Sequence, residues 1–145
     1  MKIAKAMKHI ARLKGKIAET TNRINKCVST DVDNEFDEKF TDLVLTRNTL
    51  VLDLISLKDK VMKANIKHDK FTLILELAEA KNKIDMFKNL NIRNGKHNSG
   101  FSSNETVYKT QYTIVERNNK IEEIQNLIND ITDELDVFNA STDIY

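Results

Sequence analysis

Apolar residues in the first part of the chain return at alternating spacings of three and four. One set of positions holds Ile3, Ile10, Ile17 and Ile24, and the interleaved set holds Ala6, Leu13, Thr20 and Cys27. This repeat keeps one stripe of a helix turned toward a partner helix, as in a coiled coil. It predicts a helix over residues 2–28, which at 1.5 Å per residue would be about 40 Å long.

A second helix is predicted over residues 36–67, after a turn at 29–35. Its seam consists of Phe36, Phe40, Leu43, Arg47, Leu50, Leu54, Leu57, Val61 and Ala64. A further stripe of Val44, Val51, Ile55 and Met62 widens the apolar surface. A helix that is apolar on two sides is expected to contact more than one neighbour.

Two more helices are predicted over residues 70–90 and 108–139. The seam of the first contains Leu73, Leu77, Ala80, Ile84 and Phe87, and that of the second contains Ile114, Arg117, Ile121, Ile124, Ile128, Ile131, Leu135 and Phe138. The expected fold is all-α, a single domain over 1–145 built as an antiparallel bundle of long helices with coiled-coil-like seams. The leftover apolar surface predicts a homo-oligomer.

A polar insert at 91–106 interrupts this pattern and continues into an extended run that reaches Thr113. Asn94-Gly95 is a strong signal for a tight turn between two short strands. The following run from Thr106 to Thr113 is rich in β-branched and aromatic residues, which favours a hairpin or extended arm. A loop of this length inside a compact domain is usually functional or disordered, and it can also clasp another subunit.

The overall charge is balanced, with 23 basic and 22 acidic side chains. This balance disfavours a dedicated nucleic-acid-binding protein. The chain has no continuous apolar run long enough for a membrane span or a signal peptide, and its single cysteine fits a reducing compartment. These features predict a soluble cytoplasmic protein.

The charges are nevertheless segregated along the sequence. Residues 1–28 carry eight basic groups and one acid, whereas residues 30–42 carry six acids and one base. Lys2, His9, Lys16 and Arg23 share one flanking position of the repeat. That stripe could track phosphates, or it could face acidic segments of this chain or of a second subunit.

Signals of catalysis are mostly absent. The three histidines are far apart in the sequence, and none has a second His or Cys at metal-ligand spacing. No glycine-rich phosphate loop or nucleophile motif is present, and Cys27 lies on a seam expected to be buried. We therefore expect no cofactor, no metal and no enzymatic activity, with a hydrolase using carboxylates and His97 as a minor alternative.

Two arginines stand on stripes that are otherwise apolar, Arg47 and Arg117. Each could pair with an acid such as Asp53 or Asp130, or fix the helix register, because an unpaired buried charge is costly. Each could instead bind an anion, since guanidinium suits phosphate and carboxylate. With the donors and aromatic residues of the insert, the candidate ligand-binding residues are Arg47, Arg93, Lys96, His97, Ser102, Tyr108, Lys109, Tyr112 and Arg117.

A further set of motifs runs through most of the chain: KVMKAN (60–65), Thr72-Leu73, Phe101, Ser102 and Glu105, ELD (134–136) and NASTDI (139–144). With these motifs the chain resembles the small bacterial family known as septicolysin, although Ala140 replaces the family's Trp. Ser103 and Val107 stand where the family has Arg and Lys, so an anion site of that family would be altered here. The family's name implies a cytolysin, but the predicted helices offer no membrane element for pore formation.

Two hypotheses from different classes follow. The first is a non-catalytic oligomeric helical protein that binds or sequesters a small anionic, nucleotide-like ligand between helices or subunits. In it, the tyrosines would stack on a base, and Arg93, Lys96 or Lys109 would meet phosphate. The second is a structural or scaffolding oligomer with no small-molecule ligand.

Overall fold

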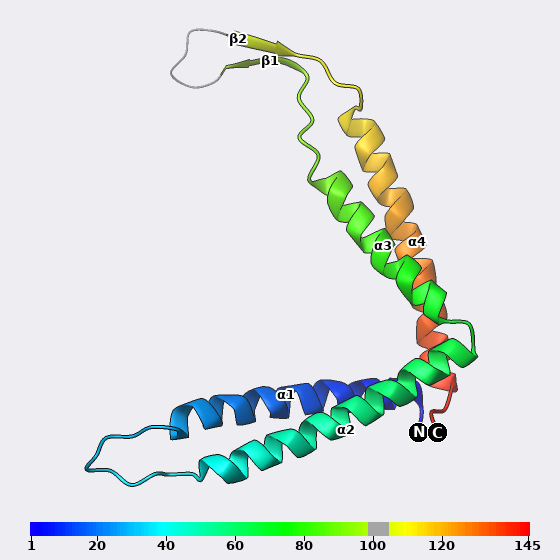
Figure 1. The fold of residues 1–145 in the computed structure, drawn as a ribbon. Coiled ribbons are helices and arrows are strands. Elements are labelled where there is room, and N and C mark those ends of the chain that lie inside the picture. The colour runs from blue at the N-terminus through cyan, green and yellow to red at the C-terminus, as the bar shows by residue number, and fades with distance from the viewer. Residues whose placement is uncertain (99–104) are drawn as a thin grey trace. The chain divides into compact units, whose positions relative to one another are not determined.

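The computed structural model describes residues 1–98 and 105–145 of the chain. Its elements, in order, are α1 (Ile3–Cys27), α2 (Phe40–Lys67), α3 (Phe71–Lys88), β1 (Gly95–Asn98), β2 (Glu105–Tyr108) and α4 (Ile114–Ser141) (Figure 1). Contacts divide the chain into two compact units, Met1–Phe71 with Leu135–Tyr145, and Thr72–Glu134. The predicted fold class is confirmed, because the chain is mostly helical, its helices pair antiparallel and it carries one short hairpin.

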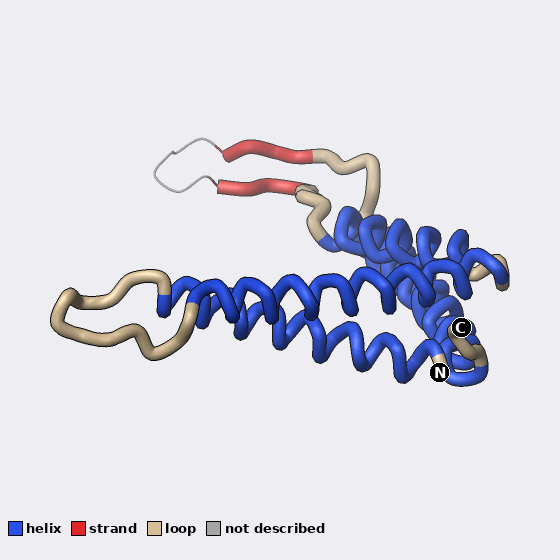
Figure 2. Tube along the Cα trace, turned by 60° about the horizontal axis from the view of Figure 1, so that its bottom comes forward, coloured by secondary structure: helices blue, strands red, loops and turns tan. Residues whose placement is uncertain are grey.

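In the first unit, α1 and α2 run antiparallel to one another (Figure 2). All eight predicted seam positions of α1 are buried or half-buried, which confirms the coiled-coil pattern. The core of this unit gathers Ile3, Ala6, Ala64, Phe138 and Ile144, with Leu57 and Val61 packed against it. Burial of this apolar surface provides the main stabilisation of the unit.

The two chain ends are joined by backbone and ionic contacts. The Ile3 N–H donates to the Thr142 carbonyl at 2.9 Å, and the Ile144 N–H donates to the Met1 carbonyl at 2.8 Å. Lys2 Nζ lies 2.7 Å from Asp143 Oδ2, and the amino group of Met1 lies 3.4 Å from Asp143 Oδ1. The hydrogen bond from Lys2 and the two positive charges lower the pKa of the Asp143 carboxyl.

This clasp of the chain ends is predicted to be pH-dependent. The pKa of the Asp143 carboxyl is lower in the folded chain than in the unfolded chain. The stabilisation that its ionised form gives the folded state is therefore complete above the ordinary carboxyl pKa of about 4, and it is lost as the pH falls through the lowered pKa of the folded chain. Hydrogen exchange of the Ile144 N–H, corrected for its intrinsic rate, should therefore speed up in acid. Asp143→Asn should remove this pH dependence, whereas Asp136→Asn should keep it. An unchanged profile in Asp143→Asn would refute the assignment.

Helix α2 begins at Phe40 rather than near residue 36 as predicted, and Phe36 is 63 % exposed. The Asp33 N–H donates to Asp31 Oδ1 at 3.0 Å, and the Asn34 N–H donates to the Asp31 carbonyl at 3.0 Å. Such local bonds hold the backbone in a turn and compete with a helix. Glu38 also forms an ion pair with Arg23, so this member of the basic stripe faces an acidic segment of its own chain.

The second unit is built on α3 and the first part of α4. Ala80 and Ile84 pack with Ile124 and Ile128, and Leu77, Phe87 and Ile121 lie against this core. The predicted seams of both helices are thus confirmed over this region. Helix α4 begins at Ile114 rather than near 108, because Thr113 and Glu116 form a capping box. The Thr113 N–H donates to Glu116 Oε2 at 2.7 Å, and the Glu116 N–H donates to Thr113 Oγ1 at 3.1 Å.

The hairpin pairs β1 with β2 antiparallel, and Gly95 lies opposite Tyr108. The predicted tight turn at Asn94-Gly95 is therefore wrong. Gly95 is the first residue of β1 and has a φ of +85°, so its positive φ serves the entry of the chain into the hairpin rather than its tip. Residues 99–104, among them the predicted site residue Ser102, lie outside the described residues.

Gly95→Ala is expected to destabilise the hairpin by about 1 kcal/mol, because an L side chain disfavours this positive φ although space is available for the Cβ. Amide exchange of residues 96–98 and 106–108 should report the loss. Gly15→Ala is the matched control. This glycine lies within α1 with open space around it, so alanine should stabilise the chain by about 0.5–1 kcal/mol. Equal exchange of the hairpin in wild type and Gly95→Ala would contradict the expectation.

Candidate functional site

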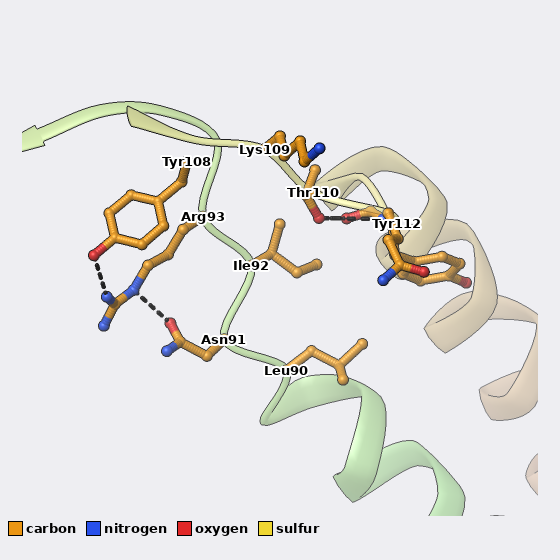
Figure 3. Close-up of a pocket in the computed structure, with 9 residues that line it drawn as sticks. Leu90, Asn91, Ile92, Arg93, Tyr108, Lys109, Thr110 and Tyr112 are labelled. Atoms are coloured by element: carbon orange, nitrogen blue, oxygen red, sulfur yellow. Dashed lines mark hydrogen bonds between the residues drawn. The ribbon is translucent and has the colours of Figure 1, made fainter. Parts of the chain in front are cut away.

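A pocket of about 460 Å³ lies at the base of the hairpin, where the chain enters β1 and leaves β2 (Figure 3). The lining residues are Leu90, Asn91, Ile92, Arg93, Tyr108, Lys109, Thr110, Gln111 and Tyr112. Four of them, Arg93, Tyr108, Lys109 and Tyr112, are predicted site residues. The structure thus brings part of the predicted set together in one concave site.

Arg93 is held by neutral partners. Its Nε donates to Asn91 Oδ1 at 3.2 Å, and its Nη1 donates to the Tyr108 hydroxyl at 3.1 Å (Figure 3). The guanidinium carbon lies 5.1 Å from the centre of the Tyr108 ring, a cation–π contact. Among the described residues, Nη2 has no hydrogen-bond partner and the guanidinium has no carboxylate partner. Arg93 is therefore oriented, yet its charge is not neutralised.

Two predicted site residues lie on β1 beside the pocket and do not line it. The His97 ring meets the Tyr108 ring edge-on, with centroids 5.4 Å apart, and its Nε2 lies 3.3 Å from the Asn94 carbonyl oxygen. Lys96 Nζ lies 4.0 Å from Glu105 Oε2 on the opposite strand. His97 supports one wall of the site, and the charge of Lys96 is partly balanced by Glu105.

The opposite wall is fixed by the ends of α3 and α4. The Tyr112 ring lies 5.9 Å from the Phe87 ring, and its hydroxyl donates to the Glu116 carbonyl at 3.3 Å. The Thr110 hydroxyl donates to the Tyr112 carbonyl at 2.7 Å and accepts from the Tyr112 N–H at 3.1 Å. These bonds anchor a loop side chain to the helical core of the second unit.

The electrostatics of the pocket favour an anion. Its nine lining residues include two cations, Arg93 and Lys109, and no acid. Lys109 forms no ion pair with any residue that the structure describes. Arg and Lys without a nearby carboxylate, beside a tyrosine ring, suit a ligand that carries phosphate or carboxylate and a flat apolar part.

Arg47 and Arg117 do not line this pocket. Arg47 belongs to the first unit, where its Nε donates to the Thr21 hydroxyl at 2.9 Å. Arg117 lies in the first turn of α4, and its Nε and Nη2 donate to Asn118 Oδ1 at 3.2 and 3.1 Å. Both side chains are half-buried, and neither forms an ion pair within the described ranges, so the expected pairing with Asp53 or Asp130 is not seen.

Five lining residues were missed from the sequence: Leu90, Asn91, Ile92, Thr110 and Gln111. The capping box Thr113–Glu116 was a readable signal, because it ends the predicted helix extension over 108–113. With that segment removed from the helix, Thr110 and Gln111 become loop residues, and they line the pocket together with residues 90–93 before β1. Nothing in their own chemistry marks Leu90 and Ile92 as site residues.

A larger pocket of about 590 Å³ lies between α3 and α4 in the second unit. It is lined by four acids, Glu76, Glu79, Glu123 and Asp130, and by only two lysines, Lys83 and Lys120. Its floor includes Ala80, Ile124 and Leu127. Because acids outnumber bases there, this pocket fits an anionic ligand less well than the hairpin base does.

Comparison of the chain with protein-family models, curated proteins and solved structures finds no significant match. The septicolysin resemblance therefore stays a prediction, and function has to be inferred from the residues of this chain. Among the described residues, no helix is long and apolar enough to cross a membrane, and no group of three or more His, Cys, Asp or Glu is arranged to hold a metal ion.

Proposed function

We propose that this chain is a non-catalytic binding protein whose site for a small anionic, nucleotide-like ligand is the pocket at the base of the hairpin. The observation that carries the proposal is the oriented guanidinium of Arg93 beside Lys109 and Tyr108, with no carboxylate partner for Arg93 and no acid in the pocket lining within the described part of the chain. Binding would lower the concentration of free ligand available to other proteins, which is a sequestering role.

Each lining group has a part in the proposed complex. The Nη2 of Arg93, which has no hydrogen-bond partner among the described residues, and the ammonium of Lys109 would contact phosphate oxygens, where charge-assisted hydrogen bonds are strongest. A base would stack on Tyr108 or Tyr112, and the amides of Asn91 and Gln111 would offer donors and acceptors to its edge. Among the residues that the structure describes, the lining contains no Ser, Cys, His, Asp or Glu, and the Thr110 hydroxyl is already bonded to Tyr112, which favours binding over hydrolysis.

Calorimetric titration of the full chain tests this proposal. The probes are nucleoside mono-, di- and cyclic phosphates, with the matching nucleosides as controls. We expect binding that requires the phosphate and weakens as salt rises, because ionic contacts are screened. Equal binding of nucleoside and nucleotide, or no binding by any member of the panel, would refute it.

A second candidate function, a scaffolding oligomer, is favoured by a separate observation. The first unit exposes large apolar side chains along one side of α2, and contiguous apolar surface of this kind is typical of a protein–protein interface. Assembly through α2 does not itself exclude a ligand, since the pocket belongs to the second unit and α2 to the first, so the scaffold without a ligand has to be distinguished at the pocket. An empty pocket in a protein that still assembles would support the scaffold alone.

A further inference from the structure

Helix α2 carries a second apolar stripe that its own fold leaves uncovered. We call it the outer stripe; its apolar members are Leu45, Leu52, Ile55, Met62 and Ile66, and its polar members are Asn48 and Asp59. The five apolar side chains are 52–68 % exposed. Contiguous exposed apolar surface, unlike single scattered apolar residues, marks interaction sites.

The outer stripe has the spacing of a coiled-coil seam. Its seven members follow one another at intervals of three or four residues from Leu45 to Ile66, about 30 Å along the helix. Leu52 lies about 200° around the helix from both Leu50 and Leu54, which belong to the half-buried seam on the α1 side. The stripe is therefore on the side of α2 turned away from α1.

We propose that the outer stripe binds the same stripe of a second copy of this chain, with the two α2 helices antiparallel. In this register, Leu45 meets Met62 of the partner subunit, and Leu52 meets Ile55 of the partner subunit. The two polar positions then fall in one layer, where the Asn48 amide can donate to the carboxylate of Asp59 of the partner subunit. One two-fold axis satisfies all of these layers at once, as a symmetric dimer requires.

Charge decides the orientation. A parallel, in-register pair would place Asp59 against the partner subunit's Asp59 in the seam, and Lys58 against the partner subunit's Lys63 at its edge, two contacts of like charge. The antiparallel pair avoids both and brings Asp42 beside the partner subunit's Lys63. Within one chain, Lys63 already pairs with Asp59 at 2.7 Å, so both charges lie at this surface.

Disulfide trapping tests the register directly. In a Cys27→Ala background that keeps Asn48 and Asp59, Leu45→Cys and Met62→Cys are made singly and together. Residues 45 and 62 of one helix are about 25 Å apart, too far for an intrachain disulfide. We expect a covalent dimer from the double variant, and from a mixture of the two single variants, but not from either single variant alone.

The other outcomes overturn the proposal. Cross-linking of each single variant alone would show a parallel pair, and no cross-linking of any variant would show that a second copy does not cover this stripe. A second measurement uses Leu52→Lys, whose exposed position leaves the monomer fold intact. Sedimentation should show the dimer dissociation constant of Leu52→Lys raised by at least about 100-fold, whereas Val32→Lys, at a 98 % exposed loop position, should dimerise as wild type does. Equal association of both variants would refute the interface.

Discussion

Arg93→Ala is expected to weaken binding of a phosphate-bearing ligand about 10- to 100-fold, because it removes charge-assisted hydrogen bonds worth about 1.5–3 kcal/mol. The fold should survive, since the side chain is exposed and its two partners are neutral groups, of which Asn91 is exposed and Tyr108 half-buried. Calorimetric titration with the tightest member of the nucleotide panel gives the ratio of dissociation constants.

Arg12→Ala is the matched control, because it removes an exposed arginine of the same charge from α1. Its affinity should equal that of wild type. If both variants lose affinity equally, the ligand responds to the net charge of the chain and the pocket is not its site. Arg47→Ala and Arg117→Ala complete the series: the geometry predicts little change, and a large loss would return these two arginines to the site.

Ile3→Ala should destabilise the first unit by about 2–4 kcal/mol, the usual result of deleting a buried aliphatic side chain. Ile3 has no exposed surface and packs in the cluster that joins both chain ends to α2. Urea unfolding followed by circular dichroism measures the change. Because the chain forms two units, a shift confined to one transition would identify the unit that contains Ile3.

Ile114→Ala is the comparison for this core substitution. Ile114 is 52 % exposed at the start of α4, so the same chemical change should cost well under half as much. Ile3→Val should fall between the two, at about 0.5–1.5 kcal/mol. Similar losses for Ile3→Ala and Ile114→Ala would mean that the cluster around Ile3 contributes no more than surface positions do.

The sequence predicts the helices well because burial follows one period. Every predicted seam position of α1 is buried or half-buried, and Ile124, Ile128, Ile131, Leu135 and Phe138 are buried on α4. The same reasoning extends the helices too far at their N-terminal ends. Phe36 fits the apolar spacing, but a hydrogen bond to the Asp31 side chain holds the segment just before it in a turn. At the fourth helix, the hydrogen bonds of Thr113 with Glu116 begin α4 at Ile114 rather than near 108.

The hairpin and pocket were harder to predict for a different reason. A glycine after an asparagine suits a tight turn, yet the same glycine also suits a strand entry with positive φ, as Gly95 shows. Only the pairing of residues 95–98 with 105–108 distinguishes the two. Arg93, Tyr108, Lys109 and Tyr112 were recognisable as polar and aromatic groups in one insert. Arg47 and Arg117 were proposed from seam position alone, which predicts that a side chain faces a neighbouring helix but not which group it contacts there.

The proposed ligand site is tested most directly by native mass spectrometry of the full chain purified from its expression host, with and without the nucleotide panel. The expected result is one discrete phosphate-bearing mass bound per chain, retained by Arg12→Ala and lost by Arg93→Ala. A chain that binds no member of the panel, or that binds one equally well after Arg93→Ala, would contradict the proposed site.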